Sequence, residues 1–341
     1  MFINACRRSL VALLLVLCGC SKMGPMKESY NAALDDPIFR QSFANKTIEG
    51  VLPASGVPAA DLQKLRMLDL NIHMPEDIMG GGMVYLANTD QKRLAFLKKA
   101  LLYKHKDVIV WPLRGGYGSA RLIEGLNALP QPTHQNTFVG FSDMTALHLF
   151  LSQAWGWKTI HGSGLQALLK PEQDSDNFLK IASIIAGAKQ STIEDLRPMN
   201  PKAIALKQVK GLLTGGNLTL VQTSIGTHWQ IQSQDKILFL EDTSEKGYKI
   251  DRAFTQLGQA GVFKGVKAIV LGQFEENDPS KPDVLFALER FAKEIAIPVF
   301  KCDAFGHGMK NYPLVYNSEA SIRPVKAVGV DKPFFELLMK F

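Results

Sequence analysis

The sequence predicts an α/β protein with two lobes, in which helices cover parallel strands. Strand-like apolar runs alternate with helical segments along most of the chain, which is typical of βαβ units. The 341 residues are 46% hydrophobic and 21% charged, so the chain can bury two sizeable cores. A polar, helical stretch with Pro171 and Pro198 interrupts the alternation. We therefore expect an N-terminal lobe over 48–165, an inter-lobe linker over 166–205 and a C-terminal lobe over 206–330.

The first residues predict export and a lipid anchor. Arg7 and Arg8 precede an unbroken apolar run over 10–17, which is shorter than the about 20 residues of a membrane span. The run ends in Leu-Cys-Gly-Cys, which resembles the lipobox of bacterial lipoproteins with Cys20 as the acceptor. We expect a signal peptide over 1–19 and a tether over 20–47 that has room for one short helix.

Such a protein would face the periplasm on an anchor in the outer membrane, because Ser21 rather than Asp follows the acceptor cysteine. A plain secretory peptide or a short buried helix would explain the same residues. A cytoplasmic location remains the alternative.

Charge and cysteine content exclude several other classes. The net charge is +7, but the basic residues are scattered and form no stripe, which argues against a nucleic-acid partner. Of the four cysteines, only Cys302 remains after removal of the signal and lipidation, so no disulfide framework is expected. The chain has neither a C-x-x-C pair nor an H-E-x-x-H motif, and we predict no metal or other cofactor.

The segment 108–126 carries the most informative motif. An apolar strand over 108–113 enters a glycine-dense turn over 114–118, and Ser119 then precedes a helix over 120–126. A strand, a sharp turn, a serine and a helix start form a nucleophile elbow in outline, in which helix N–H groups would face an oxyanion. Tyr117 and Arg121 occupy the glycine positions of G-x-S-x-G. A glycine-rich turn with Ser119 as an ordinary helix cap therefore stays open.

A serine nucleophile needs a base and an acid that orients the base. His307, which lies between two glycines after a strand, and His161, which also follows a strand, are the candidate bases. Glu241 ends an apolar strand and is the candidate acid, with Asp242 as its rival. Ser119, Glu241 and His307 all follow the carboxyl ends of strands, where open α/β sheets place their sites.

Five blocks in order resemble the signature of the LD-carboxypeptidases, serine peptidase family S66. The blocks cover residues 114–122, 140–147, 215–218, 240–252 and 305–308. The resemblance extends over residues 48–325. It implies a homodimer with a Rossmann-like N-terminal lobe and a C-terminal lobe built on a β-barrel or sandwich. That C-terminal core differs from the helix-rich pattern of 206–330.

The resemblance also implies an activity, the release of C-terminal D-alanine from murein tetrapeptides by a Ser-His-Glu triad. By motif position, Ser119 is the nucleophile, His307 the general base and then acid, and Glu241 the group that orients His307. The backbone N–H groups of Ala120 and Gly116 would form the oxyanion hole.

Three further residues are candidates for contact with the substrate. Arg114 could hold the free carboxylate of the peptide. Asp143 could face the diaminopimelate amine, and Asn217 is the third candidate. Each of these two residues would equally serve as the N-cap of the helix that follows it in the sequence. The sequence does not decide between diaminopimelate and lysine before the D-alanine.

Two other functions remain open. The microcin-immunity branch of the same family cleaves a peptidyl-nucleotide amide with the same triad. A catalytically silent murein-binding lipoprotein would need no triad.

Overall fold

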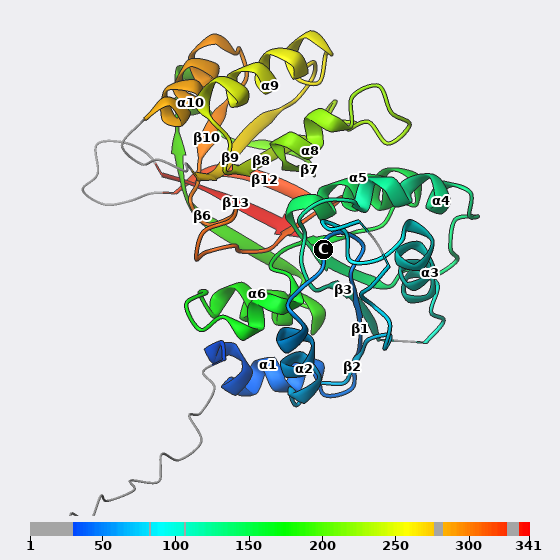
Figure 1. Cartoon of the computed structure of the whole chain (residues 1–341). Helices are drawn as coiled ribbons and strands as arrows, with labels where there is room; N and C mark the ends of the chain where they lie inside the picture. Colours follow the sequence, from blue (N-terminus) through cyan, green and yellow to red (C-terminus); the bar gives the residue numbers. More distant parts are fainter. Residues whose placement is uncertain (1–29, 82, 106, 276–281, 326–333) are drawn as a thin grey trace, which may run out of the picture.

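The computed structural model describes residues 30–81, 83–105, 107–275, 282–325 and 334–341. These residues form two lobes in contact, with the chain passing from the lower lobe to the upper one in Figure 1. The expected signal peptide over 1–19 and the expected lipid site at Cys20 lie outside the described residues. Within the described ranges, no helix has the length and apolar character that crossing a membrane requires.

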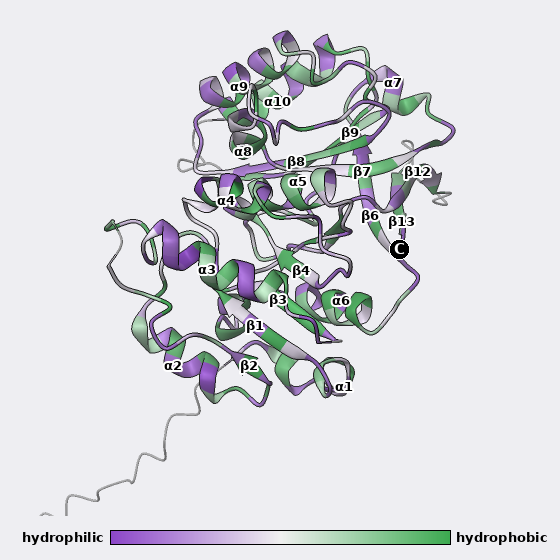
Figure 2. Ribbon diagram, turned by 90° about the vertical axis from the view of Figure 1, so that its right-hand side faces the viewer, coloured by the Kyte–Doolittle hydropathy of each residue, from purple (hydrophilic) through white to green (hydrophobic). Residues whose placement is uncertain are grey.

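The N-terminal lobe is built on a six-stranded sheet with the order β11-β5-β4-β3-β1-β2. Its strands pair in parallel, except that β11 runs antiparallel to β5. The central strand β3 is buried along its whole length, as expected of a strand covered on both faces. Figure 2 shows β3 and β4 largely in green, which marks hydrophobic residues. The bounds are β1 Thr47–Val51, β2 Ile72–His73, β3 Val108–Pro112, β4 Thr137–Gly140, β5 Ile160–His161 and β11 Leu314–Val315.

Helices pack around this sheet. One of them, α5, is buried at eight of its ten positions, because it lies between the sheet and the C-terminal lobe, where it contacts β7 and α8. The helices are α2 Ala59–Met67, α3 Asp90–Leu101, α4 Ile123–Asn127, α5 Thr145–Ala154 and α6 Asp176–Ile185, with 3₁₀ turns η2 Ser119–Leu122, η3 Ser142–Met144 and η4 Leu165–Leu169.

The C-terminal lobe is a closed seven-stranded barrel with the order β10-β6-β13-β12-β7-β8-β9. The strands β7 to β10 pair in parallel, and β6, β13 and β12 complete the barrel with antiparallel pairs. The bounds are β6 Gln190–Pro198, β7 Val209–Asn217, β8 Ile237–Thr243, β9 Ala268–Glu275, β10 Val299–Lys301, β12 Glu319–Val325 and β13 Phe334–Lys340.

Helices accompany the parallel half of the barrel. They are α7 Pro201–Ile204, α8 Leu218–Thr223, α9 Gly247–Gln259 and α10 Asp283–Glu294. The rings of Phe254 in α9 and Phe291 in α10 stack with their centroids 3.9 Å apart, which joins the two helices. The α/β class, the parallel N-terminal lobe and the C-terminal barrel are therefore confirmed. The helices expected from the sequence pattern flank that barrel.

The expected tether over 20–47 is wrong for its described part, because that part packs on the N-terminal lobe, although it does contain the short helix that the sequence allowed. Residues 30–47 contain η1 Ala32–Asp35 and α1 Pro37–Phe43, which pack on the N-terminal lobe. Phe39 is fully buried, and the ring of Phe43 stacks on Trp111 with a centroid separation of 5.7 Å. The two aromatic residues are four apart and share one face of α1, so the helix has an apolar side to bury.

The expected linker and C-terminal boundary also need correction. The range 166–205 contains α6 and the barrel strand β6, which pairs with β13 and β10. The barrel ends beyond residue 330, because β13 closes it, whereas β11 returns to the N-terminal sheet. Most positions of β6 are at least partly exposed, so its polar sequence resembles that of a linker.

Candidate active site

A buried carboxylate and a histidine from the C-terminal lobe form the centre of the site. Glu241 lies near the end of β8 and is fully buried. Its Oε2 accepts a hydrogen bond of 2.7 Å from Nδ1 of His307, which lies in the loop after β10. The side chain of His307 remains 16% exposed. Because Glu241 engages Nδ1, Nε2 is the ring nitrogen left for proton transfer with a substrate-side group.

The electrostatics of this pair favour a charged imidazole. Burial by itself lowers the pKa of His307, but the charge of Glu241 and its hydrogen bond outweigh burial and raise the pKa above the ordinary 6.5. The carboxylate would therefore stabilise an imidazolium that forms during a reaction.

The two rival residues have other surroundings. Asp242 is buried and acts as a cap, because its carboxylate accepts hydrogen bonds from the Asn217 amide and from the backbone and hydroxyl of Thr219. His161 is fully buried, and neither of its ring nitrogens has a hydrogen-bond partner within the described part of the chain. Burial lowers the pKa of His161 well below 6.5. The geometry thus favours Glu241 and His307 over both rivals.

Ser119 does not join this pair. Its side chain is fully buried, and its hydroxyl donates a hydrogen bond of 2.6 Å to the backbone carbonyl of Asp143. The Ser119 N–H donates to the Asp143 carboxylate at 2.8 Å. These contacts tie the glycine turn to the neighbouring loop, and they argue against the nucleophile role expected for Ser119.

Ser142 has the strand–turn–helix geometry that was expected at Ser119. It follows β4 directly, precedes α5 and has a φ of 62°, in the left-handed region that serine rarely adopts. A Cβ at Gly140 would lie 2.8 Å from Cγ of Met144, so glycine is needed for the tight strand-to-helix turn. A serine at a strained strand–turn–helix corner is a nucleophile elbow.

Ser142 and His307 line the same cavity. The cavity has a volume of about 360 Å³, and Phe141, the residue before Ser142, also lines it. The ring of Phe141 contacts that of His307 with their centroids 4.8 Å apart. Ser119 is absent from the described lining of this cavity.

The glycine turn forms a wall against Ser142. A Cβ at Gly115 would lie 3.2 Å from both the Ser142 hydroxyl and the backbone nitrogen of Asp143. Gly116 also lines the cavity, and its φ of 109° requires glycine. Ala120, the other predicted oxyanion-hole residue, follows Ser119 in η2 and is not among the described lining residues.

The three predicted substrate residues fall into two groups. Arg114 lines the cavity. Asp143 is only 2% exposed, and burial raises the pKa of its carboxyl although Ser119 donates a hydrogen bond to it. Asn217 caps α8 through a hydrogen bond from the Leu220 N–H. The cap interpretation therefore fits Asn217, and Asp143 holds the turn of Ser119 in place.

Polar side chains missed at the sequence level hold the loop of His307. Gln273 in β9 accepts a hydrogen bond of 2.6 Å from the Gly308 N–H and donates one to the Asp303 carbonyl. Asn311 accepts a hydrogen bond from the Gly306 N–H. These contacts fix the loop on both sides of the histidine.

Ser142 could have been found from the sequence. Gly140-Phe141-Ser142 matches the first three positions of G-x-S-x-G, whereas a tyrosine stands at the first of these positions before Ser119. Lys170, which also lines the cavity, gives no comparable signal, because nothing in its local pattern separates it from other surface lysines.

Comparisons with known proteins identify the family. Residues 48–162 match the LD-carboxypeptidase N-terminal domain, and residues 210–322 match the LD-carboxypeptidase C-terminal domain. The murein tetrapeptide carboxypeptidase of Pseudomonas aeruginosa is 31% identical over 294 residues, which cover 79% of this chain and 91% of that protein. A carboxypeptidase homologue of Rickettsia conorii is 47% identical over 284 residues, covering 82% and 89% of the two chains.

Solved structures agree with this result. The crystal structure of muramoyltetrapeptide carboxypeptidase from Oxalobacter formigenes aligns with a TM-score of 0.73 at 25% identity, covering 87% of this chain and 99% of that chain. An MccF-like protein from Bacillus anthracis aligns with a TM-score of 0.70 at 20% identity, covering 86% and 97%, and supports the fold alone. The chain therefore belongs to the LD-carboxypeptidase family S66 and is a serine-type carboxypeptidase, a hydrolase.

Proposed function

We propose that this protein releases the C-terminal D-alanine of murein tetrapeptides, with Ser142 in the role that the sequence analysis gave to Ser119. One observation carries the proposal. The Glu241–His307 pair and the left-handed Ser142 belong to one cavity, while Ser119 is buried with its hydroxyl engaged. We propose murein peptides as the substrates because the Pseudomonas aeruginosa relative is a murein tetrapeptide carboxypeptidase.

The mechanism follows from these groups. Nε2 of His307 accepts the proton of the Ser142 hydroxyl as the oxygen attacks the carbonyl before D-alanine. Glu241 stabilises the resulting imidazolium. The protonated His307 then donates its proton to the leaving amine of D-alanine, and water hydrolyses the acyl-enzyme with His307 again as the base.

With Ser142 as the nucleophile, the residues assigned to the oxyanion hole also change. The N–H after the nucleophile in an elbow is that of Asp143, which replaces the predicted Ala120. Gly116 remains as the second candidate donor, because Gly115 and Gly116 line the cavity and Gly115 lies against Ser142.

The charges of the cavity suit a peptide with free carboxylates. Arg114 and Lys170 line it, and the described lining residues include no aspartate or glutamate. A carboxypeptidase must hold a terminal carboxylate, and an arginine or a lysine can do so. We assign Arg114 and Lys170 to this task and leave Asp143 and Asn217 out of the substrate contacts.

The cellular setting is part of the proposal. The lipobox-like residues support a lipoprotein anchored through Cys20 at the periplasmic face, which would act on murein or on released muropeptides. Acyl-chain labelling that is lost in Cys20→Ser would support the anchor, whereas an unprocessed chain in the cytoplasm would contradict it. We also propose a homodimer, for which light scattering should give about twice the monomer mass of the processed chain.

Mass spectrometry tests the activity directly. The purified protein is incubated with disaccharide-tetrapeptide that ends in D-alanine, and a parallel sample ends in L-alanine as the stereochemical control. We expect a loss of one alanine from the first substrate only. Binding without cleavage would favour a silent murein-binding protein, and cleavage of an aspartyl-nucleotide amide alone would favour the microcin-immunity activity.

A further inference from the structure

A second pocket lies on the barrel, away from the catalytic cavity. It has a volume of about 640 Å³, within the range of small-molecule sites. It lies beside the first residues of β7 and the residues that precede β8 and β9. Lys236 comes just before β8, whereas Glu241 stands near the end of that strand, roughly 16 Å away along it. The pocket is therefore separate from the proposed active site.

The strand register builds one wall of this pocket. Lys210 of β7 pairs with Ser321 of β12, and Ser321 pairs with Leu338 of β13. Two residues away from this pair, Glu319 of β12 pairs with Lys340 of β13. Residues two apart on a strand share a face, so Lys210 and Lys340 lie on the same surface of this sheet.

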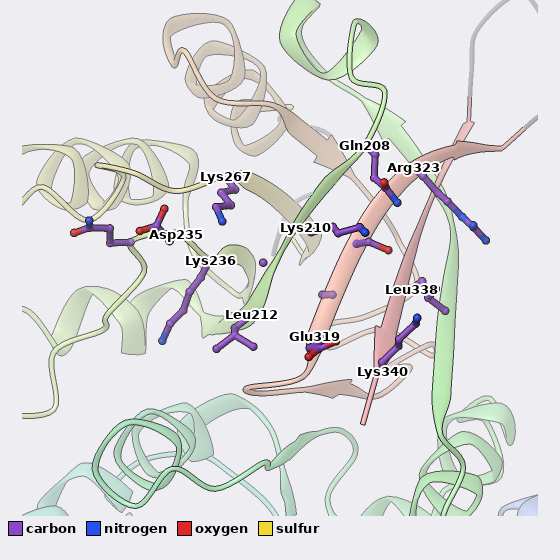
Figure 3. Close-up of a pocket in the computed structure, with 14 residues that line it drawn as sticks. Gln208, Lys210, Leu212, Asp235, Lys236, Lys267, Glu319, Arg323, Leu338 and Lys340 are labelled. Carbon is purple, nitrogen blue, oxygen red and sulfur yellow. The ribbon is translucent and has the colours of Figure 1, made fainter.

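The second wall comes from the turn before β8. The backbone of Lys267 donates a hydrogen bond to the carbonyl of Lys236, which brings the two lysines side by side. Figure 3 shows Lys236 and Lys267 on one side of the pocket and Lys210, Arg323 and Lys340 on the other. A Cβ at Gly211 would lie 3.0 Å from the Asp235 carbonyl, so glycine lets the two walls meet closely.

Positive charge dominates the lining. Five basic side chains line the pocket against two acidic ones, Asp235 and Glu319. Arg323 is paired with Glu336, but none of the ion pairs among the described residues includes Lys210, Lys236, Lys267 or Lys340. Burial lowers the pKa of the half-buried Lys236, as expected of an ammonium without a compensating anion.

We propose that this pocket, lined by Lys210, Lys236, Lys267 and Lys340, is a binding site for an anion that carries phosphate. Lysine acts as a point charge for phosphate, and four lysine ammonium groups together suit a multiply charged anion of this kind, while the Arg323 guanidinium is engaged by Glu336. Ser321 and Gln208 add neutral hydrogen-bonding groups to the lining. The phosphate comes either from a soluble phosphorylated compound or from a lipid headgroup, and the two arms of the test separate these sources.

Calorimetric titration of the full chain in detergent tests the proposal. The probes are inorganic pyrophosphate for the soluble source and glycerophosphoglycerol for a lipid headgroup. The test variant combines Lys210→Gln, Lys236→Gln and Lys340→Gln. The control variant combines Lys99→Gln, Lys202→Gln and Lys293→Gln, which removes the same charge from exposed positions elsewhere.

The expected result is that one of the probes binds the wild type and the control variant equally and binds the test variant roughly tenfold or more weakly. Equal binding to all three proteins would show unspecific attraction and overturn the proposal, and so would an absence of binding by the wild type. A test variant that changes the oligomeric state instead, without any effect on either probe, would identify the pocket as a subunit interface. Tetrapeptide cleavage should be unchanged in the test variant, so this proposal and the proposed function can fail independently.

Discussion

Replacing each of the two candidate serines by alanine gives the sharpest prediction for the site. Ser142→Ala removes the oxygen that shares a cavity with His307. Loss of the nucleophile in serine hydrolases lowers kcat by about 10⁴–10⁶, which corresponds to about 5–8 kcal/mol of transition-state stabilisation. We expect D-alanine release to fall by this factor, while the melting temperature stays close to that of the wild type.

Ser119→Ala is the matched control. The change removes one buried hydrogen bond to the Asp143 carbonyl, worth about 1 kcal/mol of folding stability. The melting temperature should fall by a few degrees, about 2–4 °C per kcal/mol for a larger domain, while kcat stays within about tenfold of the wild type. Both variants are assayed by the rate of alanine release from tetrapeptide and by thermal unfolding.

One pattern of results would refute this reasoning. If folded Ser119→Ala lost several orders of magnitude in kcat while Ser142→Ala turned over normally, the elbow at Ser119 would be the nucleophile, and the buried hydroxyl would have to move during catalysis.

Three further changes test the base, the turn and the N-terminal helix. The pKa of His307 is raised above 6.5 and its neutral form is the base, so wild-type kcat/KM should fall as the pH drops through a value above 6.5. Glu241→Gln should move this fall to lower pH and reduce kcat by about 10⁴. Both effects are measured in a pH profile of the wild type and the variant. An unmoved profile would contradict the pairing. Gly115→Ala puts a Cβ 3.0 Å from that of Ser142 and should lower kcat about 10²-fold in a protein that still melts normally, whereas unchanged kcat would show that the turn has room. Phe39→Ala should cost about 3–5 kcal/mol in urea unfolding, and a loss below about 1 kcal/mol would show that α1 is dispensable.

Much of the fold was predictable because local patterns agree with burial. The apolar run of β3 and the strand β8 are buried on both sides, so their sequences show continuous hydrophobicity. β6 was missed because most of its positions are at least partly exposed and its sequence is therefore polar. The packing of α1 on the N-terminal lobe was missed, because only Phe39 and Phe43 reveal a buried face in this polar segment.

The site was predictable in part for a related reason. The contact between Glu241 and His307 was predictable because a carboxylate after an apolar strand needs a partner and a glycine-flanked histidine has room to supply it. The sequence favoured Ser119 over the proposed Ser142 because both serines lie between a buried strand and a helical turn. Gly140, two residues before Ser142, is the sequence signal that separates them, and the structure adds the positive φ of Ser142 and the hydrogen bond that engages the Ser119 hydroxyl.

Covalent labelling would test the central claim most directly. A fluorophosphonate transfers its phosphonyl group to an activated serine oxygen with loss of fluoride, and peptide mapping by mass spectrometry locates the added mass. We predict a single label on the peptide that contains Ser142, which disappears in Glu241→Gln or after competition with tetrapeptide. A label on Ser119, or no label on an enzyme that still releases D-alanine, would contradict the account.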